Sequence, residues 1–248
     1  MRLARIAISF LTRLPVGNID CTPIEIGRAS RWFPLTGALL GAIYIGAWRI
    51  LTPFFSPLVV AVLIALLDAL LTGALHLDGL ADSADGFGAG RTRDDVLRIM
   101  RDHAVGSYGA SALVLAIALK IAAVSATITE GGAIHALLLA PVLGRWSSVF
   151  SASVAGYARP REDDSPRAVG SPSRFVGWTE LIVASVSAVV ATAALRSWRA
   201  AIASAAAAIV ATGWTFVCRR RIAGVTGDTL GAGIVIVECG VLLVFAAN

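Results

Sequence analysis

The chain has 248 residues, of which 57% are hydrophobic and only 15% are charged. A soluble domain usually has about 25% charged residues, so this composition excludes an ordinary soluble protein and predicts an integral membrane protein. The formal net charge is +5. Because the arginines lie in loops beside apolar segments and we find no nucleic-acid-binding motif, we expect lipid and phosphate, not nucleic acid, as anionic partners.

The first apolar segment covers only residues 3–12 and is followed by Arg13 and Pro15. It is too short to cross a bilayer, and its flanks do not fit a secretory signal peptide. The segment therefore predicts a short amphipathic helix that lies on the membrane surface.

Seven longer apolar segments follow, and most approach the roughly 20 residues that a helix needs to cross a bilayer. They cover about 33–51, 58–76, 107–128, 133–155, 179–195, 200–217 and 229–247. These segments and their short connections use nearly the whole chain. The sequence therefore predicts one integral membrane domain, 1–248, folded as an all-α polytopic bundle of about seven transmembrane helices.

The basic residues are distributed unevenly between the connections. If the N-terminus is cytoplasmic, 16 of the 21 basic residues lie on the cytoplasmic side. They belong to segments 1–31, 77–106, 156–178 and 218–228. This bias predicts a multi-pass protein of the cell membrane with a cytoplasmic N-terminus and cytoplasmic polar loops.

The strongest candidate site directly follows the second apolar segment, where His76, Asp78, Asp82 and Asp85 lie within ten residues. On a helix, the spacings of four and three residues place the three carboxylates on one face. Unpaired carboxylates there would repel one another, whereas Mg²⁺ prefers such oxygen ligands. The cluster predicts a catalytic magnesium site for phosphate chemistry, with an ordinary acidic surface as the alternative. For His76 three interpretations stay open: a metal ligand, a catalytic base that contacts the metal ligands, or an ordinary histidine at the edge of the span.

A second candidate segment, RTRDDVLRIMRDHAVGSYG, covers residues 91–109. It predicts a short helix that begins at Asp94 or Asp95, followed by a span that opens at Gly106 and offers free N–H groups to an anion. We expect Arg101, Asp102 and Gly106 to bind substrate. The alternative is a surface helix with internal ion pairs.

The third candidate segment, GVTGDTLG at residues 224–231, opens the last span. Its hydroxyls and glycines predict a phosphate-binding turn formed by Thr226, Gly227 and Thr229, with Asp228 as a further metal ligand. The alternative is that Asp228 or Thr229 simply caps the helix.

Away from the ends of the predicted spans lie four ionisable residues, and a charge there is a functional hypothesis by default: Asp68, Lys120, Arg145 and Glu238. Arg145 is the better phosphate clamp because its guanidinium is always charged. Asp68 is expected to pair with Lys120 or Arg145 if it lies too far from the carboxylate cluster.

In chain order, these segments resemble the adenosylcobinamide-GDP ribazoletransferase family, also called the cobalamin 5′-phosphate synthases. The matching motifs are ISFLTRLPV at 8–16, FPLTG at 33–37, HLDGLADSADG at 76–86, IMRDHAVGSYG at 99–109 and GVTGDTLGA at 224–232, with shorter elements at 144–145 and 157–159. The chain departs from the family at Val235, where a tail acid is usual, and in its charged loop 159–170.

The resemblance implies a transferase of cobalamin biosynthesis. α-Ribazole or its 5′-phosphate would attack the phosphate next to the cobinamide arm of adenosylcobinamide-GDP, and GMP would leave, with Mg²⁺ required. We assign the following roles: Asp78, Asp82 and Asp85 as metal ligands, one of them also as the base; Asp228 as an additional ligand; Arg13, Arg101 and Arg145 as substrate contacts.

The runner-up is another magnesium-dependent membrane phosphotransferase, acting on a CDP-alcohol or a polyprenyl phosphate. Its CDP-alcohol signature is absent, because no arginine stands at position 83. A transporter is the third reading, but the candidate residues gather on one face instead of at the midplane. The preferred acceptor, the number of metal ions and the oligomeric state, including a homo-oligomer, stay open.

Overall fold

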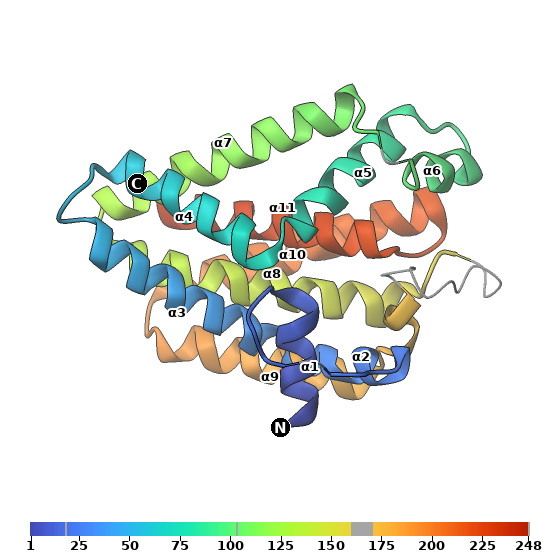
Figure 1. The fold of residues 1–248 in the computed structure, drawn as a ribbon, viewed down its shortest axis with the longest axis horizontal. Helices are drawn as coiled ribbons and strands as arrows, with labels where there is room; N and C mark the ends of the chain where they lie inside the picture. Colours follow the sequence, from blue (N-terminus) through green and yellow to red (C-terminus); the bar gives the residue numbers. More distant parts are fainter. Residues whose placement is uncertain (18, 103, 160–170, 248) are drawn as a thin grey trace.

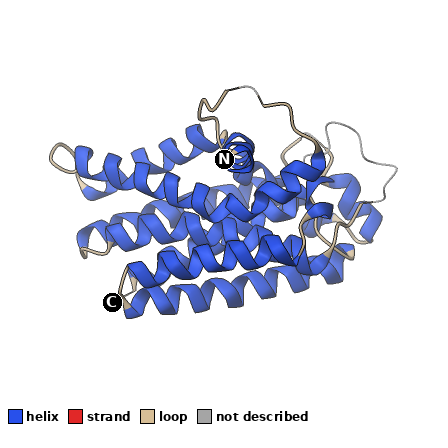
Figure 2. Ribbon diagram, turned by 90° about the horizontal axis from the view of Figure 1, so that it is seen from below, coloured by secondary structure: helices blue, strands red, loops and turns tan. Residues whose placement is uncertain are grey.

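The computed structural model describes residues 1–17, 19–102, 104–159 and 171–247, and these residues form helices without a β-strand (Figures 1 and 2). The α-helices are α1 (Arg2–Leu11), α2 (Pro23–Ala29), α3 (Phe33–Leu51), α4 (Pro57–Thr72), α5 (Leu75–Ala89), α6 (Arg93–Ile99), α7 (Ser107–Thr129), α8 (Ala133–Ala155), α9 (Trp178–Ala194), α10 (Trp198–Ile222) and α11 (Gly227–Ala246). Short 3-10 turns, η1 (Ser30–Trp32) and η3 (Ser171–Phe175), precede α3 and α9. The predicted all-α fold is confirmed.

Within the described residues, five segments are long and apolar enough to cross a membrane, or six if the bent pair α4–α5 counts as one span, which confirms a multi-pass protein. They are Pro23–Leu51, Ser107–Thr129, Ala133–Ala155, Trp198–Ile222 and Gly227–Ala246. The helix α9 is apolar but has only 17 residues. All seven predicted apolar segments are helical, but not all are full-length straight spans.

The second predicted span, 58–76, is wrong as a single straight helix. Helix α4 ends at Thr72, and α5 continues at 90° to it after a short break. Gly73 and Ala74 form the break in the left-handed region, with φ of 63° and 57°, and a left-handed glycine is a common helix end. The backbone N–H of Arg13 donates to the Leu71 carbonyl at 2.7 Å and so ties the chain after α1 to this break.

Helix α8 forms the centre of the bundle and packs against α3, α9, α10 and α11. Small residues permit the closest of these contacts. A Cβ atom on Gly37 of α3 would lie 2.3 Å from the Pro141 carbonyl oxygen of α8, so only glycine allows this approach. The close packing of α8 fixes the helices on either side of it.

The short N-terminal helix predicted at 3–12 is present as α1. Its apolar face is covered by protein, because Ile6, Ala7 and Leu11 pack with Phe33 and Val149. Its position at a membrane surface stays a prediction.

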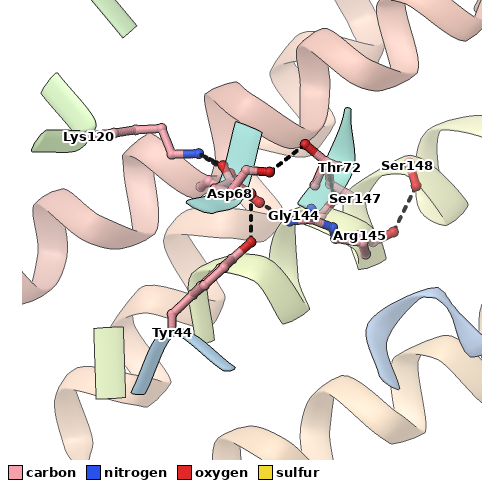
Figure 3. A network of polar contacts seen from close by, with 9 residues as sticks. Tyr44, Asp68, Thr72, Lys120, Gly144, Arg145, Ser147 and Ser148 are labelled. Carbon is pink, nitrogen blue, oxygen red and sulfur yellow. Dashed lines mark hydrogen bonds and ion pairs between the residues drawn. The ribbon is translucent and has the colours of Figure 1, made fainter. Parts of the chain in front are cut away.

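The charged residues inside the bundle form one ionic network (Figure 3). Lys120 Nζ lies 2.8 Å from Asp68 Oδ2 and 2.7 Å from Glu238 Oε2, and the Tyr44 hydroxyl donates to Asp68 Oδ1 at 2.7 Å. Arg145, which is 0% exposed, pairs with Glu238. The expected pairing of Asp68 is therefore confirmed. The prediction that Arg145 clamps phosphate is not retained, since its guanidinium is enclosed and pairs with a carboxylate.

Candidate active site

The three predicted carboxylates lie on α5, as the sequence indicated, but their environments differ. Asp78 is exposed, Asp82 is half-buried and Asp85 is buried. Packing of the helix against α7 and α11 produces this gradient.

Asp85 caps the next long helix. Its carboxylate accepts hydrogen bonds from the backbone N–H groups of Gly106 at 2.7 Å and Gly109 at 2.9 Å, at the start of α7. These N–H groups have no partner within their own helix, and a negative charge there is favoured by the helix dipole. The anion predicted to bind at Gly106 is thus supplied by the protein itself. Gly106 is not retained as a substrate contact, and Asp85 is better explained as a helix cap than as a metal ligand.

The start of α11 brings a fourth carboxylate to α5. Asp228 lies in the first turn of α11, and its Oδ2 atom is 3.2 Å from Arg159 Nη2. Thr226 caps the helix, and its side chain and that of Thr229 form a reciprocal capping box. Both threonines are 0% exposed. Thr226 and Thr229 are therefore not retained as phosphate contacts, and the cap is Thr226 instead of Asp228 or Thr229. Gly227 lines the cavity described below.

The resulting cluster is strongly acidic. Asp82 experiences the negative charges of Asp228, Asp78 and Asp85, and Arg159 is the cation that acts on it. Hard carboxylate oxygens of this kind fit Mg²⁺. However, within the part of the chain that the structure describes, no three His, Cys, Asp or Glu side chains converge into a ready-made metal site. Metal binding by Asp78, Asp82 and Asp228 stays a prediction.

Arg159 is the residue of this cluster that the sequence analysis did not select. The segment before it pairs with the α10–α11 connection: Ala158 N donates to Val225 O, and Val225 N donates to Gly156 O, both at 2.9 Å. Arg93 fastens the same region, because its Nε donates to Ile222 O at 3.1 Å. The motif at 157–159 was the available signal for Arg159. The rest of the charged loop, 160–170, lies outside the described residues.

Helix α6 also begins differently from the prediction. Its cap is Thr92, and Asp95 completes the capping box, so neither Asp94 nor Asp95 is the first residue. Hydrogen bonds from Thr92 lower the pKa of Asp95. Arg101 and Asp102 follow this helix and are exposed, and Asp102 Oδ1 accepts a hydrogen bond from Ala104 N at 3.1 Å. Their role in substrate binding stays a prediction.

Arg13, predicted to contact substrate, lies beside the α4–α5 break. A Cβ atom on Gly73 would lie 2.3 Å from Arg13 Nε, so the arginine crosses this glycine closely. Its side chain is exposed, and substrate binding by it stays a prediction.

A cavity of about 130 Å³ adjoins the acidic cluster. Asp78, Asp228 and His76 line it, together with apolar residues of α1, α3, α8 and α11. His76 is buried, unlike Asp78, and both residues line the cavity. The acidic cluster and the cavity together form a site with one charged end and one apolar end.

Comparison with known proteins shows the family of the chain. The family model for cobalamin-5-phosphate synthase matches residues 3–246. An adenosylcobinamide-GDP ribazoletransferase of Syntrophobacter fumaroxidans is 39% identical over 97% of this chain and 96% of its own length. Those of Rhizobium etli and Thermoanaerobacter pseudethanolicus are 34% and 32% identical, over 97% and 98% of this chain and 94% and 96% of their own lengths. No solved structure matches the chain. The chain therefore belongs to the cobalamin-5-phosphate synthase family.

Proposed function

We propose that this protein is an adenosylcobinamide-GDP ribazoletransferase. It joins adenosylcobinamide-GDP to α-ribazole, or to its 5′-phosphate, and releases GMP. One observation of the structure carries this proposal: Asp78, Asp82 and the Asp228–Arg159 pair form one charged cluster, and Asp78 and Asp228 of that cluster also line an apolar cavity. The carboxylates can bind the metal ion that accompanies a diphosphate, and the cavity can hold an apolar part of the acceptor. The names of the relatives agree with this combination.

The reaction exchanges one bond at phosphorus for another. A free ribose hydroxyl of the acceptor attacks the phosphorus next to the cobinamide arm, and the bond from that phosphorus to the GMP oxygen breaks. When bound by Asp78, Asp82 and Asp228, Mg²⁺ would neutralise the diphosphate and the leaving GMP. Arg159 places a second positive charge at this end of the site.

The proton of an attacking hydroxyl needs an acceptor, and Asp82 is suited to that role. It is half-buried and has three carboxylates around it, so binding a proton relieves repulsion. Asp85 is unsuitable because both its oxygens already accept backbone hydrogen bonds. An acceptor that carries a 5′-phosphate keeps that phosphate in the product, so a free ribose hydroxyl attacks here too and needs the same proton acceptor.

The site belongs on the cytoplasmic face of the cell membrane, where nucleotides are available. The arginine bias supports this orientation. In Figure 1, the α5–α6 connection, the end of α8 and the α10–α11 connection lie at the same end of the bundle. The described parts of three of the four arginine-rich segments thus adjoin this end of the bundle.

The proposal is tested with the purified protein in lipid nanodiscs. Adenosylcobinamide-GDP, α-ribazole and MgCl₂ are added, and GMP and the cobalamin product are measured by chromatography. We expect equal amounts of the two products, and no product after EDTA treatment. Absence of GMP with both acceptors, or turnover of a CDP-alcohol in its place, would refute the proposal.

A further inference from the structure

The wall of the cavity beside the acidic cluster has a charged part and an apolar part, and this combination indicates the kind of ligand that the cavity binds. Asp78 and Asp228 stand at one part of its wall. Much of the remaining wall is apolar and includes Phe10, Phe33 and Val149. A ligand that fills it therefore has an apolar part next to a part that reaches the carboxylates.

The apolar wall contains a flat aromatic element. The rings of Phe10 and Phe33 are stacked, with centroids 5.9 Å apart and planes inclined by 10°. Phe33 is buried, and its position is fixed by packing against α1 and α8. Parallel aromatic walls favour planar ring systems, which gain both contact area and favourable ring–ring geometry.

Two buried polar atoms on the wall lack hydrogen-bond partners within the described residues. They are Ser30 Oγ, in a residue that is 2% exposed, and His76 Nε2, in a residue that is 6% exposed. Leaving such groups unsatisfied is unfavourable, so native proteins usually provide a partner from water or a ligand. By contrast, Ser148 on the same wall already donates to the Arg145 carbonyl at 2.8 Å.

We infer that this cavity binds the planar base of the acceptor nucleoside and that the Ser30 hydroxyl donates to its ring nitrogen. This inference rests on the proposed function and names the acceptor subsite within it. The base of ribazole is a dimethylated benzimidazole, which is apolar and, once joined to ribose, retains one ring nitrogen as an acceptor. The ribose then extends toward Asp78 and Asp228, where its attacking hydroxyl reacts.

The base of the donor fits this cavity less well. Guanine presents a carbonyl, a ring N–H, an amino group and a ring nitrogen, and each would need a partner inside the protein. Ser30 and His76 are the uncommitted buried side chains on the described wall. The corrin ring is far larger than a cavity of about 130 Å³. The acceptor base is thus the part of the two substrates that suits the cavity.

Equilibrium dialysis of α-ribazole against the purified protein, without the donor, tests the inference independently of turnover. We expect Ser30→Ala to raise the Kd for α-ribazole about tenfold, the effect of one lost hydrogen bond to a buried group. GMP binding should change less than twofold. Ser187→Ala on α9, whose hydroxyl donates to its own helix at Val183 O, is the matched control.

A second variant tests the shape of the cavity. Ala152 of α8 is buried and lines it, so Ala152→Leu should leave less room for the two methyl groups of the base. The ratio of Kd values for α-ribazole and its unmethylated benzimidazole analogue should shift at least fivefold toward the analogue. Because this ratio is measured within one sample, a partly unfolded variant does not imitate it. Ala205→Leu, at an exposed position of α10, is the control.

The possible results separate the two proposals. Unchanged α-ribazole binding in both variants, or a loss of GMP binding in its place, would overturn the assignment of the cavity. If the wild type binds α-ribazole through Ser30 but releases no GMP with adenosylcobinamide-GDP, the proposed function fails and the base subsite stands.

Discussion

Gly79 of α5 lies so close to Asp228 of α11 that a Cβ atom on Gly79 would be 2.6 Å from the Asp228 carbonyl oxygen. Atoms of a real side chain do not approach backbone this closely, so the helices meet only because position 79 is glycine. Gly231 supports the same contact, since its Cβ would lie 3.4 Å from His76 Cα. The approach of α5 to α11 is what brings Asp78 and Asp82 next to Asp228.

The first prediction concerns this contact. Gly79→Ala should push α5 away from α11 and reduce GMP release more than tenfold, because a 1 Å displacement of reacting groups has effects of this size or larger. Overpacking should also lower the stability by about 1–3 kcal/mol. Gly213→Ala on α10 is the control, since its Cβ would meet no atom within 4 Å. Equal activity of the two variants would show that the α5–α11 approach does not shape the site.

The second prediction separates two carboxylates of α5 that look equivalent in the sequence. Asp82→Asn should reduce kcat at least 100-fold at saturating Mg²⁺, because it removes both a charge near the metal and the proton acceptor. Asp85→Asn should retain much more activity and mainly lower the melting temperature, since an amide oxygen can still accept from the α7 backbone.

Activity and melting temperature are measured on the same preparations for this pair. Asp94→Asn, whose side chain is 90% exposed, is the control for loss of an acidic charge. If Asp85→Asn were as inactive as Asp82→Asn at unchanged stability, the assignment of Asp85 as a cap would be wrong.

These two aspartates also show how far sequence reasoning reaches. The spacing of Asp78, Asp82 and Asp85 predicts one helix and one acidic edge, since both follow from local periodicity. The sequence does not show which carboxylate caps α7 and which ones are free to face a metal ion. That depends on the position of Gly106 in space, which cannot be derived from its distance along the chain. The 90° break after α4 also depends on tertiary structure, because Leu71, next to the break, accepts a hydrogen bond from Arg13, about 60 residues earlier in the chain.

Arg145 and Arg159 illustrate the same limit for cations. Both occur in short motifs, and an arginine inside a predicted span is an attractive functional candidate. In the structure, Arg145 pairs with Glu238, 93 residues away, and Arg159 pairs with Asp228, 69 residues away. Pairings over such separations are set by helix packing. Ser30 carried no signal at all, because an unpartnered hydroxyl becomes visible only when its surroundings are known.

The third prediction concerns Arg159 and the metal. Arg159 lies 3.2 Å from Asp228 and opposes the charge of the acidic cluster. In Arg159→Gln the acidic cluster loses its neighbouring positive charge, so it should attract Mg²⁺ more strongly. The Mg²⁺ concentration for half-maximal activity should therefore fall, by roughly fivefold for about 1 kcal/mol of lost repulsion between the arginine and the metal ion. The KM for adenosylcobinamide-GDP should rise, because the diphosphate loses a cation.

Opposite shifts of these two constants are the specific expectation for Arg159→Gln. A magnesium titration and a donor titration of the same preparation measure them. Arg98→Gln on α6, where the side chain is 73% exposed, controls for the change in net charge. A rise in the magnesium requirement would mean that Arg159 does not compete with the metal for Asp228.

The fourth prediction concerns the ionic network inside the bundle. Glu238 contacts both Lys120 and Arg145, and with Asp68 the four charges cancel. Glu238→Gln removes one carboxylate and leaves a buried positive charge uncompensated, which should cost about 3–5 kcal/mol of stability. For a protein of this size the melting temperature in detergent should fall by roughly 10 °C. Glu25→Gln, which breaks the exposed pair with Arg2, should change it little.

We expect Glu238→Gln to be less stable because the net charge of the network changes, and not because one particular contact is lost. Adding Lys120→Gln to Glu238→Gln restores neutrality, with Asp68 and Arg145 as the remaining charges. The double variant should therefore melt at a higher temperature than Glu238→Gln alone, although it has lost more ion pairs. Differential scanning fluorimetry at a fixed detergent concentration compares the variants. If the double variant were the less stable, the individual contacts would matter more than the net charge, and Glu238 would be explained by its hydrogen bonds.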